Sequence, residues 1–101
     1  MTEVRVRQSL NDGESIALEE NDKHILLCKI SGKYHSVSNI CSHARVLLSQ
    51  GRLRGTTITC PLHGAQFDVT SGKCLGGPAF QNIESYSVSD GDNEIIIAID
   101  G

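Results

Sequence analysis

The sequence contains few aromatic residues and no long apolar run. Its 101 residues include no tryptophan, two tyrosines and two phenylalanines, so we expect a modest hydrophobic core and a single domain, residues 1–101. No run of about 18 apolar residues is present, which excludes a membrane-spanning helix. The N-terminal residues lack the apolar core of a secretory signal peptide. We therefore expect a soluble, cytoplasmic protein.

A large excess of basic residues and a nucleotide-binding glycine pattern are also missing. The formal net charge is −3 and no basic cluster occurs, so nothing indicates nucleic-acid binding. Without a glycine-rich dinucleotide fingerprint, the protein cannot collect hydride by itself. A chain of this length has no room for a second domain, so we do not expect the iron site of two histidines and one carboxylate that non-haem iron oxygenases use. We therefore expect a protein that is not itself an enzyme.

Sustained helical periodicity is absent, and short alternating or β-branched runs indicate an all-β fold. Two groups of strands bracket a glycine-rich middle segment, roughly residues 40–78, in which one irregular helical turn is expected at Arg45–Ser49. The turn signals are Asn11–Gly13, Glu20–Asp22, Ser31–Lys33 and Asp90–Asn93. The expected strands are Val4–Arg7, Ser15–Leu18, Lys23–Ile30, Tyr34–Val37, Thr56–Thr59, Ala65–Val69, Ile83–Val88 and Glu94–Ile99.

Two pairs of cysteine and histidine provide the strongest chemical signal in the chain. Cys41 and His43 are separated by one residue, Cys60 and His63 by two, and 16 residues separate the pairs. Each pair places a thiolate and an imidazole close together on a short loop. A Rieske-type [2Fe–2S] cluster requires this ligand set, with two cysteines on one iron and two histidines on the other. We therefore predict one such cluster between two loops.

Two other interpretations of these four residues must be considered. A zinc-stabilised β-domain is one, because two cysteines and two histidines also bind Zn²⁺. Zinc sites of this class usually begin with a cysteine pair and end with a histidine pair, whereas each half here is mixed. The other interpretation treats the four residues as unconnected. It leaves unexplained why two mixed pairs of uncommon residue types occur within 23 positions.

The remaining cysteines and histidines are predicted to lie outside the cluster. Cys28 lies in an apolar run and is interpreted as a buried thiol in a strand. Cys74 follows a turn and has no histidine partner, so we interpret it as a thiol that binds no iron. His24 and His35 occur in strand-like runs without cysteine neighbours and are assigned structural or surface roles.

Further residues around the two pairs make the pattern specific, and the chain resembles the Rieske family. The ordered set is Cys41-Ser42-His43, Cys60-Pro61-Leu62-His63-Gly64, Phe67-Asp68, Ser71-Gly72 and Gly77-Pro78-Ala79. The whole chain resembles the small Rieske ferredoxins of bacterial aromatic-ring-hydroxylating dioxygenase systems. This implies an antiparallel β-sandwich or barrel that carries a small cluster-binding subdomain, roughly residues 40–78. It also implies four ligands, with the histidines facing outward: Cys41, His43, Cys60 and His63.

The same resemblance implies a one-electron carrier. Such a protein accepts electrons from a flavin-dependent, NAD(P)H-oxidising ferredoxin reductase and delivers them to a terminal aromatic-ring dioxygenase. A monomer is expected for a diffusing carrier. The alternative within the fold is a small subunit of a nitrite reductase-like enzyme, but members of that group often lack the ligands that are present here.

Departures from the respiratory Rieske proteins predict a low reduction potential. Those proteins carry a serine and a tyrosine, two and four places after the second histidine, that donate hydrogen bonds to sulfur. The matching residues here, Ala65 and Phe67, have no side-chain donor. The bracing disulfide of those proteins cannot form either, because its positions are Val46 and Leu62. Fewer donors leave the reduced, more negative cluster less stabilised.

Three features near the predicted cluster each allow two interpretations. Leu62 either packs in the core or forms an apolar rim that shields the cluster and contacts partners. Pro78 either stiffens a loop over the cluster or forms a plain turn. The third feature is a group of basic residues that either meets an acidic partner surface or forms a solvated face: Arg45, Arg52, Arg54 and Lys73.

Overall fold

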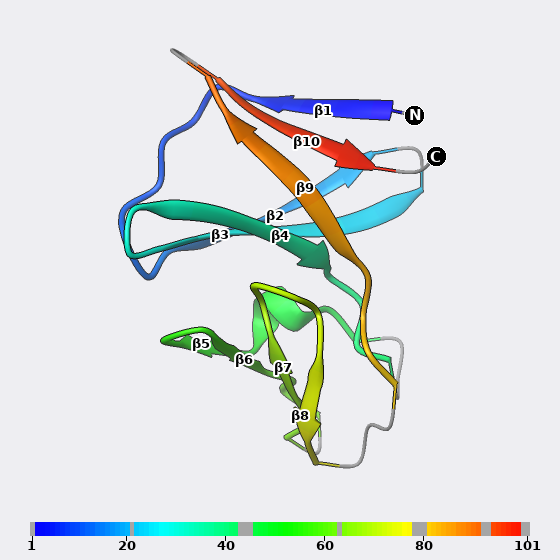
Figure 1. Ribbon diagram of the computed structural model, residues 1–101. Helices are drawn as coiled ribbons and strands as arrows, with labels where there is room; N and C mark the ends of the chain where they lie inside the picture. The colour runs from blue at the N-terminus through cyan, green and yellow to red at the C-terminus, as the bar shows by residue number, and fades with distance from the viewer. Residues whose placement is uncertain are drawn as a thin grey trace.

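The computed structural model describes residues 2–20, 22–42, 46–62, 64–77, 81–91 and 94–99. Within them the chain forms two antiparallel sheets and one short 3₁₀ helix, which confirms the all-β prediction (Figure 1). None of the helical structure in these residues is long and apolar enough to cross a membrane. The elements are β1 (Thr2–Val6), β2 (Ser15–Glu20), β3 (Lys23–Ile30), β4 (Lys33–Ser38), η1 (Leu48–Gln50), β5 (Arg52–Arg54), β6 (Thr57–Thr59), β7 (Gln66–Asp68), β8 (Cys74–Gly76), β9 (Ser85–Asp90) and β10 (Ile95–Ile99).

The larger sheet has the strand order β1-β10-β9-β4-β3-β2, and Figure 1 shows that it is strongly curled. Successive side chains of a strand point to opposite sides, and both sides of β3 are buried. Ile25 and Leu27 belong to a first apolar core, which includes residues of β1 and β10. Leu26 and Cys28 belong to a second core. One strand therefore supplies both cores.

The smaller sheet has the order β5-β6-β7-β8 and is inserted between β4 and β9 in the sequence. It lies at one end of the molecule, below the larger sheet in Figure 1. Leu53, Ile58 and Phe67 alternate with polar residues along its strands and pack in or against the second core. The second core thus joins the small sheet to β3 and β4.

The hairpin predicted at Ser31–Lys33 is confirmed. Ser31 and Gly32 have φ angles of 52° and 82°, and two positive φ angles in a two-residue loop match the twist of the flanking strands. The hairpin predicted at Asp90–Asn93 is closed by the Gly91 N–H, which donates to the Glu94 carbonyl at 2.8 Å. Asp92 and Asn93, and also Asn21 of the turn before β3, lie outside the described residues.

Several predicted boundaries are wrong, for physical reasons. The strand predicted from Ile83 begins at Ser85, because Ile83 is buried in the second core and its N–H donates to the Gly72 carbonyl at 2.8 Å. The irregular turn predicted at Arg45–Ser49 is the 3₁₀ helix Leu48–Gln50, and Arg45 lies outside the described residues. The sequence pattern also does not predict β5 and β8, which are three residues long.

Candidate metal centre

The first cysteine loop, residues 41–46, follows β4 and is closed by the backbone of Cys41. The Cys41 N–H donates to the Val46 carbonyl at 3.0 Å. Immediately outside the loop, an isolated β-bridge pairs Ile40 with Leu47. These contacts hold the two ends of the loop together. His43 belongs to this loop by sequence and lies outside the described residues.

Asn39 anchors the first cysteine loop to η1. Its side chain is buried, with Nδ2 donating to Ser49 Oγ at 3.0 Å and Oδ1 accepting the Ser49 N–H at 2.7 Å. Its carbonyl accepts the Leu48 N–H at 2.8 Å. Buried polar groups need such partners, so Asn39 fixes the chain two residues before Cys41. Sequence reasoning missed Asn39 and Ser49, because a single asparagine after a strand has no pattern of its own.

The second cysteine loop, residues 60–65, connects β6 to β7 and is closed in the same way. The Cys60 N–H donates to the Ala65 carbonyl at 2.7 Å. Inside the loop, the Leu62 N–H donates to Cys60 Sγ at 3.4 Å. A hydrogen bond of this kind stabilises negative charge on sulfur. His63 belongs to this loop by sequence and also lies outside the described residues.

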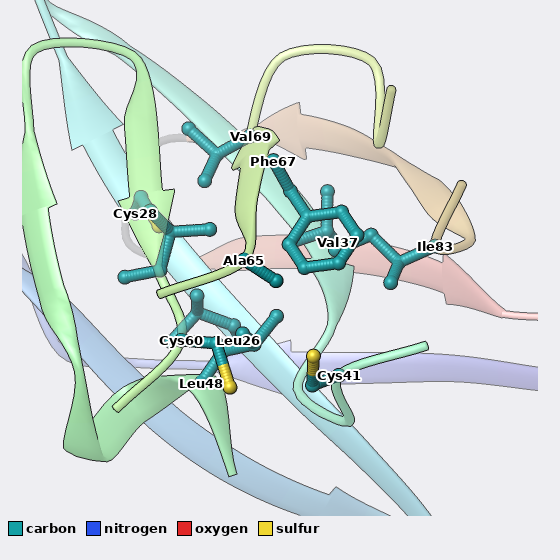
Figure 2. Close-up of a cluster of buried hydrophobic side chains, with 11 residues drawn as sticks. Leu26, Cys28, Val37, Cys41, Leu48, Cys60, Ala65, Phe67, Val69 and Ile83 are labelled. Carbon is teal, nitrogen blue, oxygen red and sulfur yellow. The ribbon is translucent and has the colours of Figure 1, made fainter. Parts of the chain in front are cut away.

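The two loops bring Cys41 and Cys60 together at the edge of the second core. Each residue is 2% exposed, and both belong to this core. Figure 2 shows both sulfur atoms at the same end of this core. Burial raises the pKa of Cys60, the Leu62 N–H opposes that rise, and the adjacent Cys41 adds to it. Because neighbouring buried thiolates repel each other, a bound cation is needed to keep both deprotonated.

The residues present fit the thiolate half of a [2Fe–2S] cluster. One iron of a Rieske cluster takes two cysteine thiolates, and this pair has a backbone N–H directed at one sulfur. Among the described residues, no three cysteine, histidine, aspartate or glutamate side chains gather as a metal site. The predicted ligands of the other iron, His43 and His63, lie outside the described residues.

Cys28 and Cys74 occupy different surroundings from the cysteine pair. Cys28 is fully buried in β3, and burial raises its pKa to about 12, which agrees with the predicted buried thiol. Figure 2 shows it apart from the sulfur atoms of Cys41 and Cys60. Cys74 lies in β8, where its N–H donates to Asn82 Oδ1 at 2.8 Å. None of the four cysteines forms a disulfide bond.

The residues that were compared with respiratory proteins lie around the second cysteine loop. Ala65 and Phe67 are fully buried in the second core, and their side chains carry no hydroxyl. Leu62 is 40% exposed, which rules out core packing and supports the apolar-rim interpretation. Pro78, the other predicted rim residue, lies outside the described residues.

Gly77 allows the segment after β8 to lie against the second cysteine loop. Its φ angle is 86°, a conformation that glycine adopts without steric cost. A Cβ at this position would lie 2.7 Å from the Cα of Ala65 and 3.0 Å from the Gly64 carbonyl oxygen. The backbone of Gly77 therefore supports the loop that carries Cys60.

Replacing Gly77 by alanine should displace this loop and reduce cluster retention. We expect less iron per chain and a loss of about 1–3 kcal/mol in the free energy of unfolding. Iron analysis, visible absorbance and thermal unfolding measure these changes. Gly55→Ala is the matched control, because Gly55 also has a positive φ angle, 59°, but no atom within 4 Å of the added Cβ. Equal losses in both variants would show that backbone strain alone is responsible.

Comparison with known proteins identifies the family. A model of the Rieske [2Fe–2S] domain matches residues 1–87. The ferredoxin component of the naphthalene 1,2-dioxygenase system of Pseudomonas putida is 36% identical over 77 residues, which cover 76% of this chain and 74% of that protein. The ferredoxin of carbazole 1,9a-dioxygenase from Nocardioides aromaticivorans IC177 has a TM-score of 0.89 and 29% identity, over 97% of this chain and 98% of that one.

A third structure contains a ferredoxin bound to another protein. It is the complex of reduced oxygenase and oxidised ferredoxin in carbazole 1,9a-dioxygenase. The matching chain has a TM-score of 0.87 and 21% identity, over 96% of this chain and all of that one. At this level of identity the likeness shows a shared fold.

The two sheets and the paired cysteine loops therefore define a Rieske-type iron–sulfur protein, whose cofactor is a Rieske [2Fe–2S] cluster. This excludes the zinc-stabilised β-domain. The chain belongs to the Rieske family, as a ferredoxin of the type found in aromatic-ring dioxygenase systems. Like these ferredoxin components, it is an electron carrier and not the catalytic component of such a system.

Proposed function

We propose that this protein is a soluble, cytoplasmic, monomeric carrier of single electrons. It accepts them from a flavin-dependent NAD(P)H ferredoxin reductase and delivers them to a terminal aromatic-ring dioxygenase. The observation that carries this proposal is the buried Cys41–Cys60 pair beside a partly exposed apolar side chain, Leu62. This arrangement shields a redox centre from water and leaves an apolar surface for contact with a partner.

The proposed ligand set combines two buried thiolates with two imidazoles. Cys41 and Cys60 would hold one iron, and His43 and His63 would hold the other as neutral imidazoles. When bound, the cluster accepts and releases one electron. Replacing two thiolates by neutral ligands makes the site less negative and therefore easier to reduce than an all-cysteine site. These residues lie in an insert, residues 40–78, of a single domain.

Each described residue of the site has a part in this function. The Leu62 N–H, 3.4 Å from Cys60 Sγ, offsets negative charge on that sulfur. Asn39 and the two loop-closing hydrogen bonds hold the cysteines in position. Rigid placement of ligands supports electron exchange, because little rearrangement is needed when the charge of the site changes.

Electron delivery in a reconstituted system tests the proposal. The assay combines NADH, the reductase and terminal oxygenase of the naphthalene 1,2-dioxygenase system, and this protein in place of that system's ferredoxin. We expect oxygenase reduction and product formation to depend on this protein and to rise with its concentration. A fully loaded protein that is not reduced by the reductase, or that delivers no electron to the oxygenase, would contradict the proposal.

Replacing Leu62 by glutamate should slow both electron acceptance and electron delivery. If one apolar rim contacts both partners in turn, a charge there weakens each contact. We expect each affinity to fall about tenfold, which is typical for the loss of an anchoring side chain at an interface. Stopped-flow reduction by the reductase and re-oxidation by the oxygenase measure the two steps separately. A shared rim also favours a small, transient interface, under about 1,200 Å².

Ala17→Glu is the control for the added charge, because Ala17 is exposed on β2 in the larger sheet. Both variants must show the wild-type visible spectrum before rates are compared. Normal rates of both steps in Leu62→Glu would show that this rim is not the common docking site.

A further inference from the structure

The outer face of the small sheet carries a basic surface that the cluster chemistry does not use. The side chains that alternate with the core-facing ones point away from the second core. They form an open groove of about 530 Å³ across β5, β6 and β7. The residues lining this groove are Arg52, Arg54, Thr57, Thr59 and Gln66.

The two arginines have no acidic partner within the part of the chain that the structure describes. Both are exposed, and the ion pairs found there involve Arg5 and His24 instead. Asp68 lies on the same face, opposite Thr57, but its Oδ1 accepts hydrogen bonds from Thr70 N at 2.8 Å and Thr70 Oγ1 at 2.6 Å. The two guanidinium groups are therefore available to external carboxylates, which they can bind in a bidentate manner.

The groove is continuous with the second cysteine loop. Thr59 is the last residue of β6 and Gln66 the first of β7, and these strand ends carry the loop from Cys60 to Ala65. A partner that contacts Leu62 at this loop can extend over the groove on the same sheet. Leu75, which is 48% exposed on β8, adds an apolar side chain to this sheet.

We propose that this groove docks an acidic surface of the flavoprotein reductase, an inference that rests on the proposed function. Charge complementarity selects an acidic partner, because two unpaired arginines stand out on a chain of net charge −3. A carrier contacts both partners near its cluster, so a surface beside the shared rim can distinguish one from the other.

The direction of electron flow selects the reductase rather than the oxygenase. The carrier becomes one unit more negative on reduction, so an acidic surface opposite it binds the oxidised form more tightly than the reduced form. On the electron donor, this difference favours release after transfer. On the acceptor, it would favour retention of the spent, oxidised carrier.

Neutralising both arginines tests the assignment. In its oxidised form, the Arg52→Gln/Arg54→Gln double variant should bind the reductase about tenfold more weakly than the wild-type protein does. Its affinity should also depend less steeply on salt concentration. Its affinity for the oxygenase should change less than about twofold. The probes are the reductase and oxygenase of the naphthalene 1,2-dioxygenase system, with binding measured by calorimetry from low to physiological ionic strength. Arg52→Lys/Arg54→Lys, which retains the charges, should recover most of the affinity.

The matched control is Arg7→Gln/Lys33→Gln, which removes two exposed positive charges beside the larger sheet. It should bind the reductase as wild type does. An equal loss in this control, an unchanged groove variant, or a loss confined to the oxygenase would overturn the inference. Visible spectra and thermal unfolding confirm that each variant is folded and loaded. If neither partner binds the loaded wild-type protein, both the proposed function and this inference are wrong. If the wild-type protein transfers electrons normally but the groove variant behaves as wild type does, only this inference is wrong.

Discussion

Replacing Cys41 or Cys60 by serine is expected to abolish the visible absorbance of the protein. Both sulfurs lie in the same buried site, 2% exposed, and no third metal-binding side chain joins them among the described residues. If these two thiolates bind one iron, as predicted, the loss of either would leave that iron with a single cysteine ligand. Iron and acid-labile sulfide, measured on protein made with full cluster loading, should fall from two of each per chain to near zero.

The other two cysteines are the controls for this prediction. Cys28→Ala and Cys74→Ser should retain the wild-type spectrum, because Cys28 lies in β3, apart from the cysteine pair, and Cys74 lies on β8. Loss of the cluster in either control would show that the wrong cysteines were assigned. His43→Ala and His63→Ala should also lose the cluster, and this result would test the two ligands that the described residues do not include.

The reduction potential should lie near the low end of the Rieske range, at about −150 mV. Ala65 is the last residue of the second cysteine loop and Phe67 follows it in β7; both are buried, and neither side chain can donate a hydrogen bond. Ala65→Ser and Phe67→Tyr each add a hydroxyl that can stabilise the reduced cluster. Each should raise the potential by tens of millivolts, a fraction of the family span of about 450 mV.

Protein-film voltammetry at neutral pH measures these shifts directly. Val69→Thr is the control, because Val69 is buried in the same core but lies farther along the chain from Cys60 than Phe67 does. It should leave the potential unchanged while adding a buried hydroxyl. A wild-type potential well above zero would contradict the assignment of Ala65 and Phe67 as the cause of a low potential.

The larger sheet could be predicted from the sequence where side-chain alternation and turn residues agree. Lys23–Ile30 was predicted with its observed bounds, because an apolar run ends at a hairpin of Ser31 and Gly32. β5 and β8 were not predicted, since three residues are too few to show a period. Their strand character comes from pairing with β6 and β7, which is a tertiary effect.

The cysteine pair of the site could be predicted from the sequence, whereas the hydrogen bonds that hold it in position could not. Cys41 and Cys60 were predicted as a pair from residue type and spacing, and the structure brings them together. The bonds that close the two loops are made by backbone atoms, which leave no pattern in a sequence. Asn39 was missed for a related reason, because its partner Ser49 is ten residues away and the contact depends on the fold.

The burial of β3 on both faces links the cluster site to the stability of the whole molecule. Ile25 and Leu27 complete one core, whereas Leu26 and Cys28 complete the other, which also contains Cys41 and Cys60. Separating the two sheets would expose the second core, and opening the larger sheet would expose the first. The protein is therefore expected to unfold as one cooperative unit, with the amide protons of β3 exchanging with solvent only when the entire chain unfolds.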